Sequence, residues 1–107
     1  MKRLEVDLSN VEEELIVRND RTVLVRPENT FFKGLQKGDI LEFNGYNLLV
    51  INVRDYPRIE ELLKIEPLEW IVTNAKDIVR ARQEYSTRFS KERRGGLKFL
   101  AIEFAKQ

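Results

Sequence analysis

The chain has 107 residues, a length typical of one domain with a single core. Hydrophobic residues make up 42% and charged residues 35%, the composition of a globular protein rather than a disordered or fibrous one. Cysteine and histidine are absent, which excludes disulfides, thiolate nucleophiles, zinc sites built on these residues and imidazole acid–base chemistry. We therefore expect no metal site and no cofactor.

The formal net charge is +1, but the charges are unevenly distributed. Residues 1–70 carry 10 basic and 14 acidic residues, whereas residues 71–107 carry 9 basic and 4 acidic ones. The C-terminal third is thus the electropositive part of the chain. No apolar run approaches the roughly 18 residues of a membrane span, and the N-terminus lacks the apolar stretch of a signal peptide. We expect a cytoplasmic protein with no membrane partner.

The chain begins with a strand and a short helix. Apolar residues alternate with other residues over positions 4–8, the period-2 pattern of a strand. Ser9 and Glu12 then have the spacing of a capping box, in which each residue satisfies the other's backbone N–H. This spacing predicts a helix over residues 10–18.

A second strand follows over residues 21–26, which are rich in β-forming residue types and stop at Pro27. Strict alternation places two valines on the core face of this strand. The same alternation places Thr22, Leu24 and Arg26 together on the opposite face.

The middle of the chain predicts a β-hairpin. A turn at residues 37–39 leads into a strand over residues 40–43. Asn44 and Gly45 form the strongest short hairpin signal, and the apolar run 48–53 follows them.

The C-terminal half predicts helices and a closing strand. A helical segment spans residues 59–63, Pro67 is expected as a first helical residue, and a longer helix spans about residues 74–90. A last strand over residues 98–104 alternates between two faces, one with Leu100, Ile102 and Phe104 and the other with Phe99, Ala101 and Glu103. The order of elements predicts an α+β protein rather than alternating βαβ units.

In this order and in several local strings, the chain resembles the ASCH family, small PUA-related barrels found alone or attached to RNA-associated proteins. The strings are the turn and strand Lys37–Phe43, similar to the family's VGDxIxF pattern, the helix Ile59–Leu63, and the closing strand Leu100–Phe104. The resemblance covers nearly the whole chain. It implies a single ASCH-like domain over residues 1–107, with a PUA-like, partly closed β-barrel and inserted helices, acting as an RNA- or nucleotide-binding module.

The family's signature is a Gly-x-Lys-x-x-Glu-x-Arg string that follows the first helix and lines the ligand cleft. It falls here on residues 19–26. Arg26 matches the final arginine, and Arg21 keeps the positive charge of the lysine. Asn19 replaces the glycine, and Leu24 replaces the glutamate. The resemblance therefore implies ligand contacts by Arg21 and Arg26, with Thr22 between them.

One bacterial branch of this family hydrolyses acetylated cytidine with a threonine and a lysine from the signature segment. The threonine position holds Leu24 here, and the lysine position holds Arg21. Leucine cannot attack a carbonyl, and an arginine with a pKa above 12 cannot act as a base near neutral pH. We assign no catalytic residue and expect no hydrolysis of acetylated cytidine.

Basic residues interleaved with aromatic ones characterise residues 76–98, a mixture that suits polyanion binding. The predicted helix places Arg82 in the middle of an apolar stripe, where an arginine is costly unless it meets a carboxylate or lines a cleft. The candidate RNA contacts are Arg82, Arg88, Lys91, Arg93 and Arg94. The alternative is a solvated helix face followed by a flexible loop.

Three functional hypotheses remain. In the first, Thr22, Leu24, Arg26 and the helix bearing Arg82 form a cleft for a base or nucleotide, while a basic loop over residues 88–98 binds the flanking backbone. The second is an enzyme acting on RNA or a modified nucleoside, as a nuclease or amidohydrolase. The third is a protein-interaction domain whose charges serve only solubility.

Overall fold

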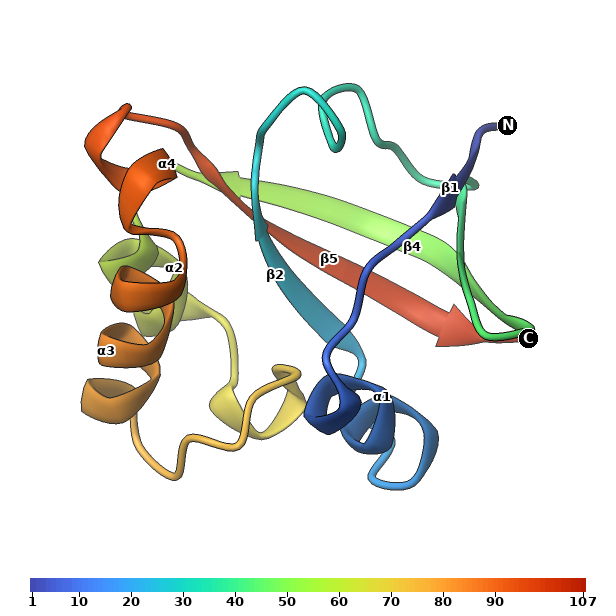
Figure 1. Ribbon diagram of the computed structural model, residues 1–107, viewed down its shortest axis with the longest axis horizontal. Helices are drawn as coiled ribbons and strands as arrows, with labels where there is room; N and C mark the ends of the chain where they lie inside the picture. Colours follow the sequence, from blue (N-terminus) through green and yellow to red (C-terminus); the bar gives the residue numbers. More distant parts are fainter.

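The computed structural model describes residues 1–107 and shows an α+β protein (Figure 1). In chain order the elements are β1 (Arg3–Glu5), α1 (Asn10–Val17), β2 (Val23–Pro27), β3 (Ile40–Phe43), β4 (Tyr46–Tyr56), α2 (Ile59–Ile65), the 3-10 helix η1 (Leu68–Trp70), α3 (Ile78–Arg88), α4 (Ser90–Arg94) and β5 (Phe99–Lys106). None of the helices has the length and apolar character needed to cross a bilayer.

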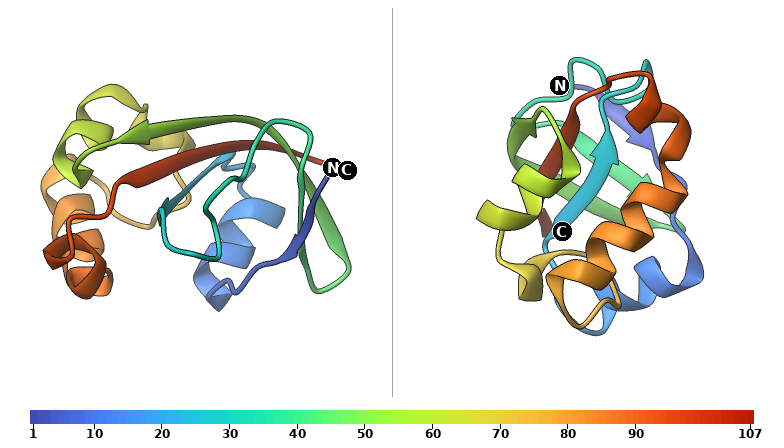
Figure 2. Two further views of the ribbon diagram at one scale, coloured as in Figure 1. Left: turned by 90° about the horizontal axis from the view of Figure 1, so that it is seen from above. Right: turned by 90° about the vertical axis from the view of Figure 1, so that its left-hand side faces the viewer.

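The five strands form one sheet in the order β1-β3-β4-β5-β2. β1 pairs with β3 in parallel, and all other neighbours are antiparallel. The pairing of β4 with β5 is shifted between Val50 and Asn52, and a bulge of this kind bends a strand and increases its twist. The long strands β4 and β5 arch accordingly, and the sheet curls into a half-barrel (Figure 2).

Each face of the sheet carries its own hydrophobic cluster. One cluster contains Val6, Leu15, Ile16, Leu24, Phe32, Leu35, Leu41, Phe43, Leu48, Val50, Val72, Leu100, Ile102 and Phe104. The other contains Val23, Val25, Tyr56, Ile59, Leu62, Leu63, Ile71, Ala81, Tyr85, Phe89, Phe99 and Ala101. The alternation predicted for the closing strand is confirmed, because Leu100, Ile102 and Phe104 belong to the first cluster and Phe99 and Ala101 to the second.

Local signals in the sequence set several of these elements. Ser9 is the N-cap of α1, its side chain accepts from the Glu12 N–H at 3.1 Å, and the Glu12 carboxylate accepts from the Ser9 N–H at 3.0 Å. Asn44 and Gly45 both have positive φ angles, of 44° and 82°, which a tight hairpin turn between β3 and β4 requires. The capping box and the hairpin are therefore confirmed.

The helices of the C-terminal half differ from the prediction. Asp77 caps α3 by accepting from the Arg80 N–H at 2.8 Å, so the helix begins at Ile78 rather than near residue 74. A second helix, α4, occupies much of the basic segment that was expected to be a loop. Pro67 only precedes η1 and lies outside any helix.

The buried side of α3 also differs from the prediction. Ala81 and Tyr85 are buried and Phe89 follows them at the same spacing of four, so these residues form the inward stripe. Of the apolar stripe expected on this helix, Tyr85 and Phe89 are buried as expected, but Ile78 and Val79 are 50% and 56% exposed. Arg82, which was placed within that stripe, lies exposed on the surface of the helix.

Candidate ligand-binding pocket

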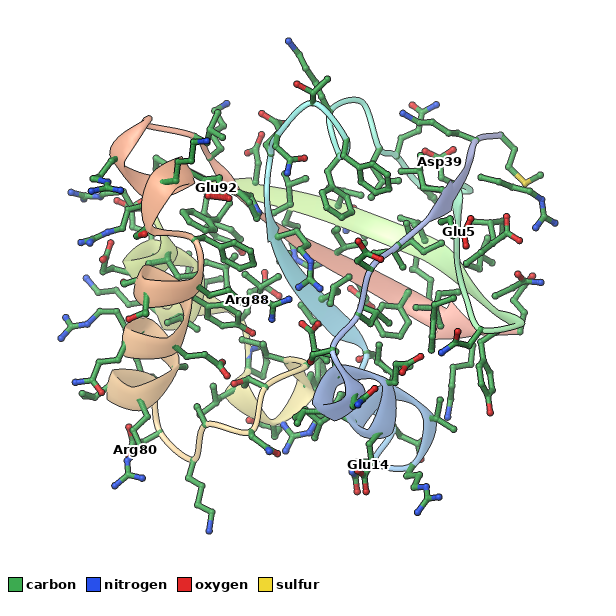
Figure 3. The ribbon with its side chains drawn as sticks, in the orientation of Figure 1. Glu5, Glu14, Asp39, Arg80, Arg88 and Glu92 are labelled. Atoms are coloured by element: carbon green, nitrogen blue, oxygen red, sulfur yellow. The ribbon has the colours of Figure 1, made fainter.

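A cavity of about 260 Å³ lies where the end of β2, the segment after it, the chain leading from β1 to α1, and the junction of α3 with α4 come together. Arg26 and Arg88 line it, together with the rings of Phe31, Phe32 and Phe89. Figure 3 shows the Arg88 side chain extending from α3 toward β2, with Glu92 above it on α4. Two residues from the predicted set, Arg26 and Arg88, therefore meet at one cavity.

The Arg26 guanidinium is held by a buried carboxylate. Its two terminal nitrogens donate to the two oxygens of Glu12, each at 2.9 Å. The same nitrogens donate to the carbonyl oxygens of Val25 at 2.9 Å and Asp7 at 3.2 Å. All four N–H groups on these nitrogens are thus engaged, and only the Nε–H group is left for a ligand.

Arg88, the last residue of α3, donates to the same Glu12 carboxylate. Its terminal nitrogens donate to the Glu12 oxygens at 3.0 and 3.1 Å. The side chain is 37% exposed, whereas that of Arg26 is 6% exposed. It also stacks over the Phe89 ring at 5.1 Å. Arg88 is therefore the arginine that a ligand can reach, and Arg26 supports it.

The charge state of Glu12 follows from these contacts. Burial by itself raises the pKa of the Glu12 carboxyl, but the hydrogen bonds from Arg26 and Arg88 outweigh it and lower the pKa to about 2. The carboxylate is thus ionised near neutral pH. Sequence reasoning recognised Glu12 only as a capping residue, and nothing local in the sequence links it to arginines 14 and 76 positions away.

The aromatic walls give the cavity its shape. Phe31 and Phe32 meet edge to face with their ring centroids 4.8 Å apart. Phe89 is held between Tyr85 and Phe99, with both centroid distances at 6.2 Å. Rings beside a guanidinium favour a flat, π-rich ligand with polar edges, such as a nucleobase.

The other residues of the signature segment lie elsewhere. Arg21 donates to the Leu68 carbonyl at 3.0 Å and lines a separate hollow beside η1. Thr22 holds β2 in place through its backbone N–H, which donates to the Trp70 carbonyl at 3.0 Å. Leu24 is completely buried, because β2 is covered on both faces, so the expectation that it lines the cleft was wrong.

The basic residues of α3 and α4 fall into two groups. Arg82 is exposed on α3 and does not line the cavity, although the helix that bears it borders the cavity through Arg88. Arg93 lies 3.6 Å from the Glu60 carboxylate, whereas Lys91 and Arg94 are exposed and make no ion pair. Lys91 and Arg94 lie within two residues of Glu92, which lines the cavity, and they are the basic residues of α4 that have no carboxylate partner.

No family model matches the chain, and no curated protein matches it. Among solved structures, the chain is similar to the crystal structure of the hypothetical protein PH0355, with a TM-score of 0.87 and 24% identity over 98% of this chain and 99% of that one. It is also similar to the solution NMR structure of protein PF0455 from Pyrococcus furiosus, with a TM-score of 0.72 and 24% identity over 98% and 96% of the two chains. These likenesses show a shared fold over the whole chain.

Proposed function

We propose that this protein is an RNA- or nucleotide-binding module of the PUA-like type, and that it holds its ligand in the cavity beside Arg88. The observation that carries the proposal is the convergence of two guanidinium groups and three phenylalanine rings on one cavity of about 260 Å³. A concave site with aromatic walls and a few convergent polar groups is typical of small-ligand binding.

The resemblance to the ASCH family supports the same site. Arg26 corresponds to the final arginine of the family signature, and it lies at this cavity. The half-barrel with helices inserted between its strands agrees with the PUA-like fold that the resemblance implies.

The charges around the cavity favour a base as the group that enters it. The two arginines share the carboxylate of Glu12, and Glu92 adds a second carboxylate to the wall. A phosphate inside would face both carboxylates, whereas a base can accept from Arg88 and donate to Glu92. The exposed cations Lys91 and Arg94 then suit the phosphates of the flanking backbone.

A pair of arginine variants on one helix tests this proposal. Fluorescence anisotropy would measure binding of a labelled single-stranded RNA, with unlabelled mononucleotides as competitors. We expect Arg88→Ala to weaken binding by about 1 to 3 kcal/mol, because it removes the ligand-facing guanidinium. The matched control Arg82→Ala removes an exposed arginine of the same helix and should leave affinity nearly unchanged.

Two outcomes would contradict the proposal. Equal losses in both variants would mean that RNA binds to the helix surface rather than in the cavity. Absence of binding to RNA and mononucleotides even at low salt would favour a protein-interaction domain instead.

A further inference from the structure

A second hollow, of about 230 Å³, lies next to the first between α1, the segment after η1, and α3. Polar groups from Ser9, Thr73, Asn74 and Glu84 line it. Arg88 borders both hollows, so its side chain separates the aromatic cavity from this polar one.

The polar hollow has the chemistry of a hydroxyl-binding site. The Thr73 hydroxyl donates to a Glu84 carboxylate oxygen at 2.7 Å and accepts from the Ala75 N–H at 3.1 Å. The other Glu84 oxygen accepts no hydrogen bond, and Glu84 is exposed to solvent. Glu84 can therefore accept from a ligand hydroxyl, as acidic residues that bind ribose do.

Arg88, which borders both hollows, can move without leaving the buried carboxylate of Glu12 unpaired. Glu12 accepts two hydrogen bonds from Arg26 and one from the Ser9 N–H in addition to the two from Arg88. If Arg88 turns away, the buried carboxylate keeps its close cation and three hydrogen bonds, so the penalty of an isolated buried charge does not arise. Arg88 is also the more exposed of the two arginines.

We infer that the two hollows form one cleft for a ribonucleoside unit, with the ring among the phenylalanines and the ribose hydroxyls at Glu84. When the ligand binds, the Arg88 side chain moves away from Glu12 to contact the ligand, and the two hollows become one continuous cleft. The inference rests on the proposed function and adds that the ribose is recognised, so that ribonucleotides bind better than their deoxy counterparts.

Titrations of the full chain with matched nucleotides test the inference. The four ribonucleoside monophosphates and their 2′,3′-dideoxy counterparts would be titrated by calorimetry. For the best-binding base we expect a preference of about tenfold for the ribose form, because a hydroxyl bonded to a carboxylate is lost in the analogue. Glu84→Gln should reduce this preference several-fold, whereas the control Glu69→Gln, an exposed carboxylate beyond the hollow, should not.

This set of variants distinguishes a loss of folding from a loss of ribose recognition. Glutamine keeps an acceptor for the Thr73 hydroxyl, so Glu84→Gln should retain the wild-type circular dichroism spectrum. Equal binding of the ribose and dideoxy forms, with Arg88→Ala still weakening both, would overturn this inference and leave the proposed function intact. If no nucleotide binds at all, both fail.

Discussion

Glu12 connects the structural and functional parts of the candidate pocket at the scale of single residues. Its carboxylate holds Arg26 from β2 and Arg88 from α3, while its position in the capping box fixes it at the start of α1. The two arginines therefore have different roles. Arg26 is buried with its terminal nitrogens fully engaged, and Arg88 is partly exposed and faces the cavity.

This division predicts different effects on stability. Arg26→Ala breaks a buried ion pair and should lower the free energy of unfolding by about 3 kcal/mol, the lower end for such pairs, because Glu12 keeps Arg88. Arg88→Ala removes a partly exposed partner and should lower it by about 1 kcal/mol or less. Urea titrations of both variants measure these values, and equal losses would contradict the assigned roles.

The pKa of Glu12 predicts how stability depends on pH. It is about 2 in the folded protein against an ordinary 4.5, so the unfolded state binds the proton more readily. The resulting stabilisation of about 3 kcal/mol is complete above pH 4.5 and is lost as the pH falls toward 2. Glu12→Gln should lack this component, while glutamine keeps the capping acceptor.

Urea midpoints at pH 7, 5 and 3 would check this expectation. Wild type should lose more stability than Glu12→Gln between pH 5 and pH 3. Parallel curves for the two proteins would show that Glu12 does not carry the acid sensitivity.

At the scale of elements, α1 and α3 bring the charged groups to the pocket, and their N-caps determine where each helix begins. Ser9 caps α1 and Asp77 caps α3. The start of α1 fixes Glu12 in its third position, from which the carboxylate reaches Arg26 on β2. A change in this cap should therefore affect both helix stability and the position of the carboxylate.

Ser9→Ala removes the hydroxyl that accepts from the Glu12 N–H and should destabilise the protein by about 1 kcal/mol. Ser9→Asp supplies another good N-cap acceptor and should retain most of the stability. Thermal unfolding of the two variants at neutral pH provides the comparison. A loss in Ser9→Asp as large as that in Ser9→Ala would mean that the cap does not contribute.

At the scale of the whole molecule, the curled sheet lies between two hydrophobic clusters. The helices α2, α3 and α4 lie together at one side of the molecule, and α1 lies at another (Figure 1). The net charge of +1 conceals a local excess of positive charge on the C-terminal helices. Because Arg88 and Arg93 already have carboxylate partners, the cations free to bind phosphate on α4 are Lys91 and Arg94.

This distribution predicts the salt dependence of RNA binding. Each cation that neutralises a phosphate of single-stranded RNA contributes about −0.7 to the slope of log K against log salt concentration. Replacing Lys91 and Arg94 with alanine should make the slope less steep by about 1.4. The control pair Arg18→Ala with Lys37→Ala removes the same two kinds of charge at exposed positions outside the C-terminal helices and should leave the slope unchanged.

The sequence by itself determined those structural features that depend only on residues close together in the chain. The capping box at Ser9 and Glu12, the Asn44-Gly45 turn and the alternation along β5 are local signals, and the structure confirms each of them. Together they predicted the α+β class. Arg26 and Arg88 were also recognised as candidates, because one matches a motif and the other lies in a basic segment.

Only the tertiary structure decided which of these side chains meet. Burial of both faces of β2 removes Leu24 from the cleft, and packing of α3 through Ala81 and Tyr85 places Arg82 on the exposed surface. The joint contact of Glu12 with Arg26 and Arg88 spans 14 and 76 positions of the chain. Such contacts depend on how the curled sheet and helices pack, because periodicity assigns a residue to a face but does not specify what covers that face.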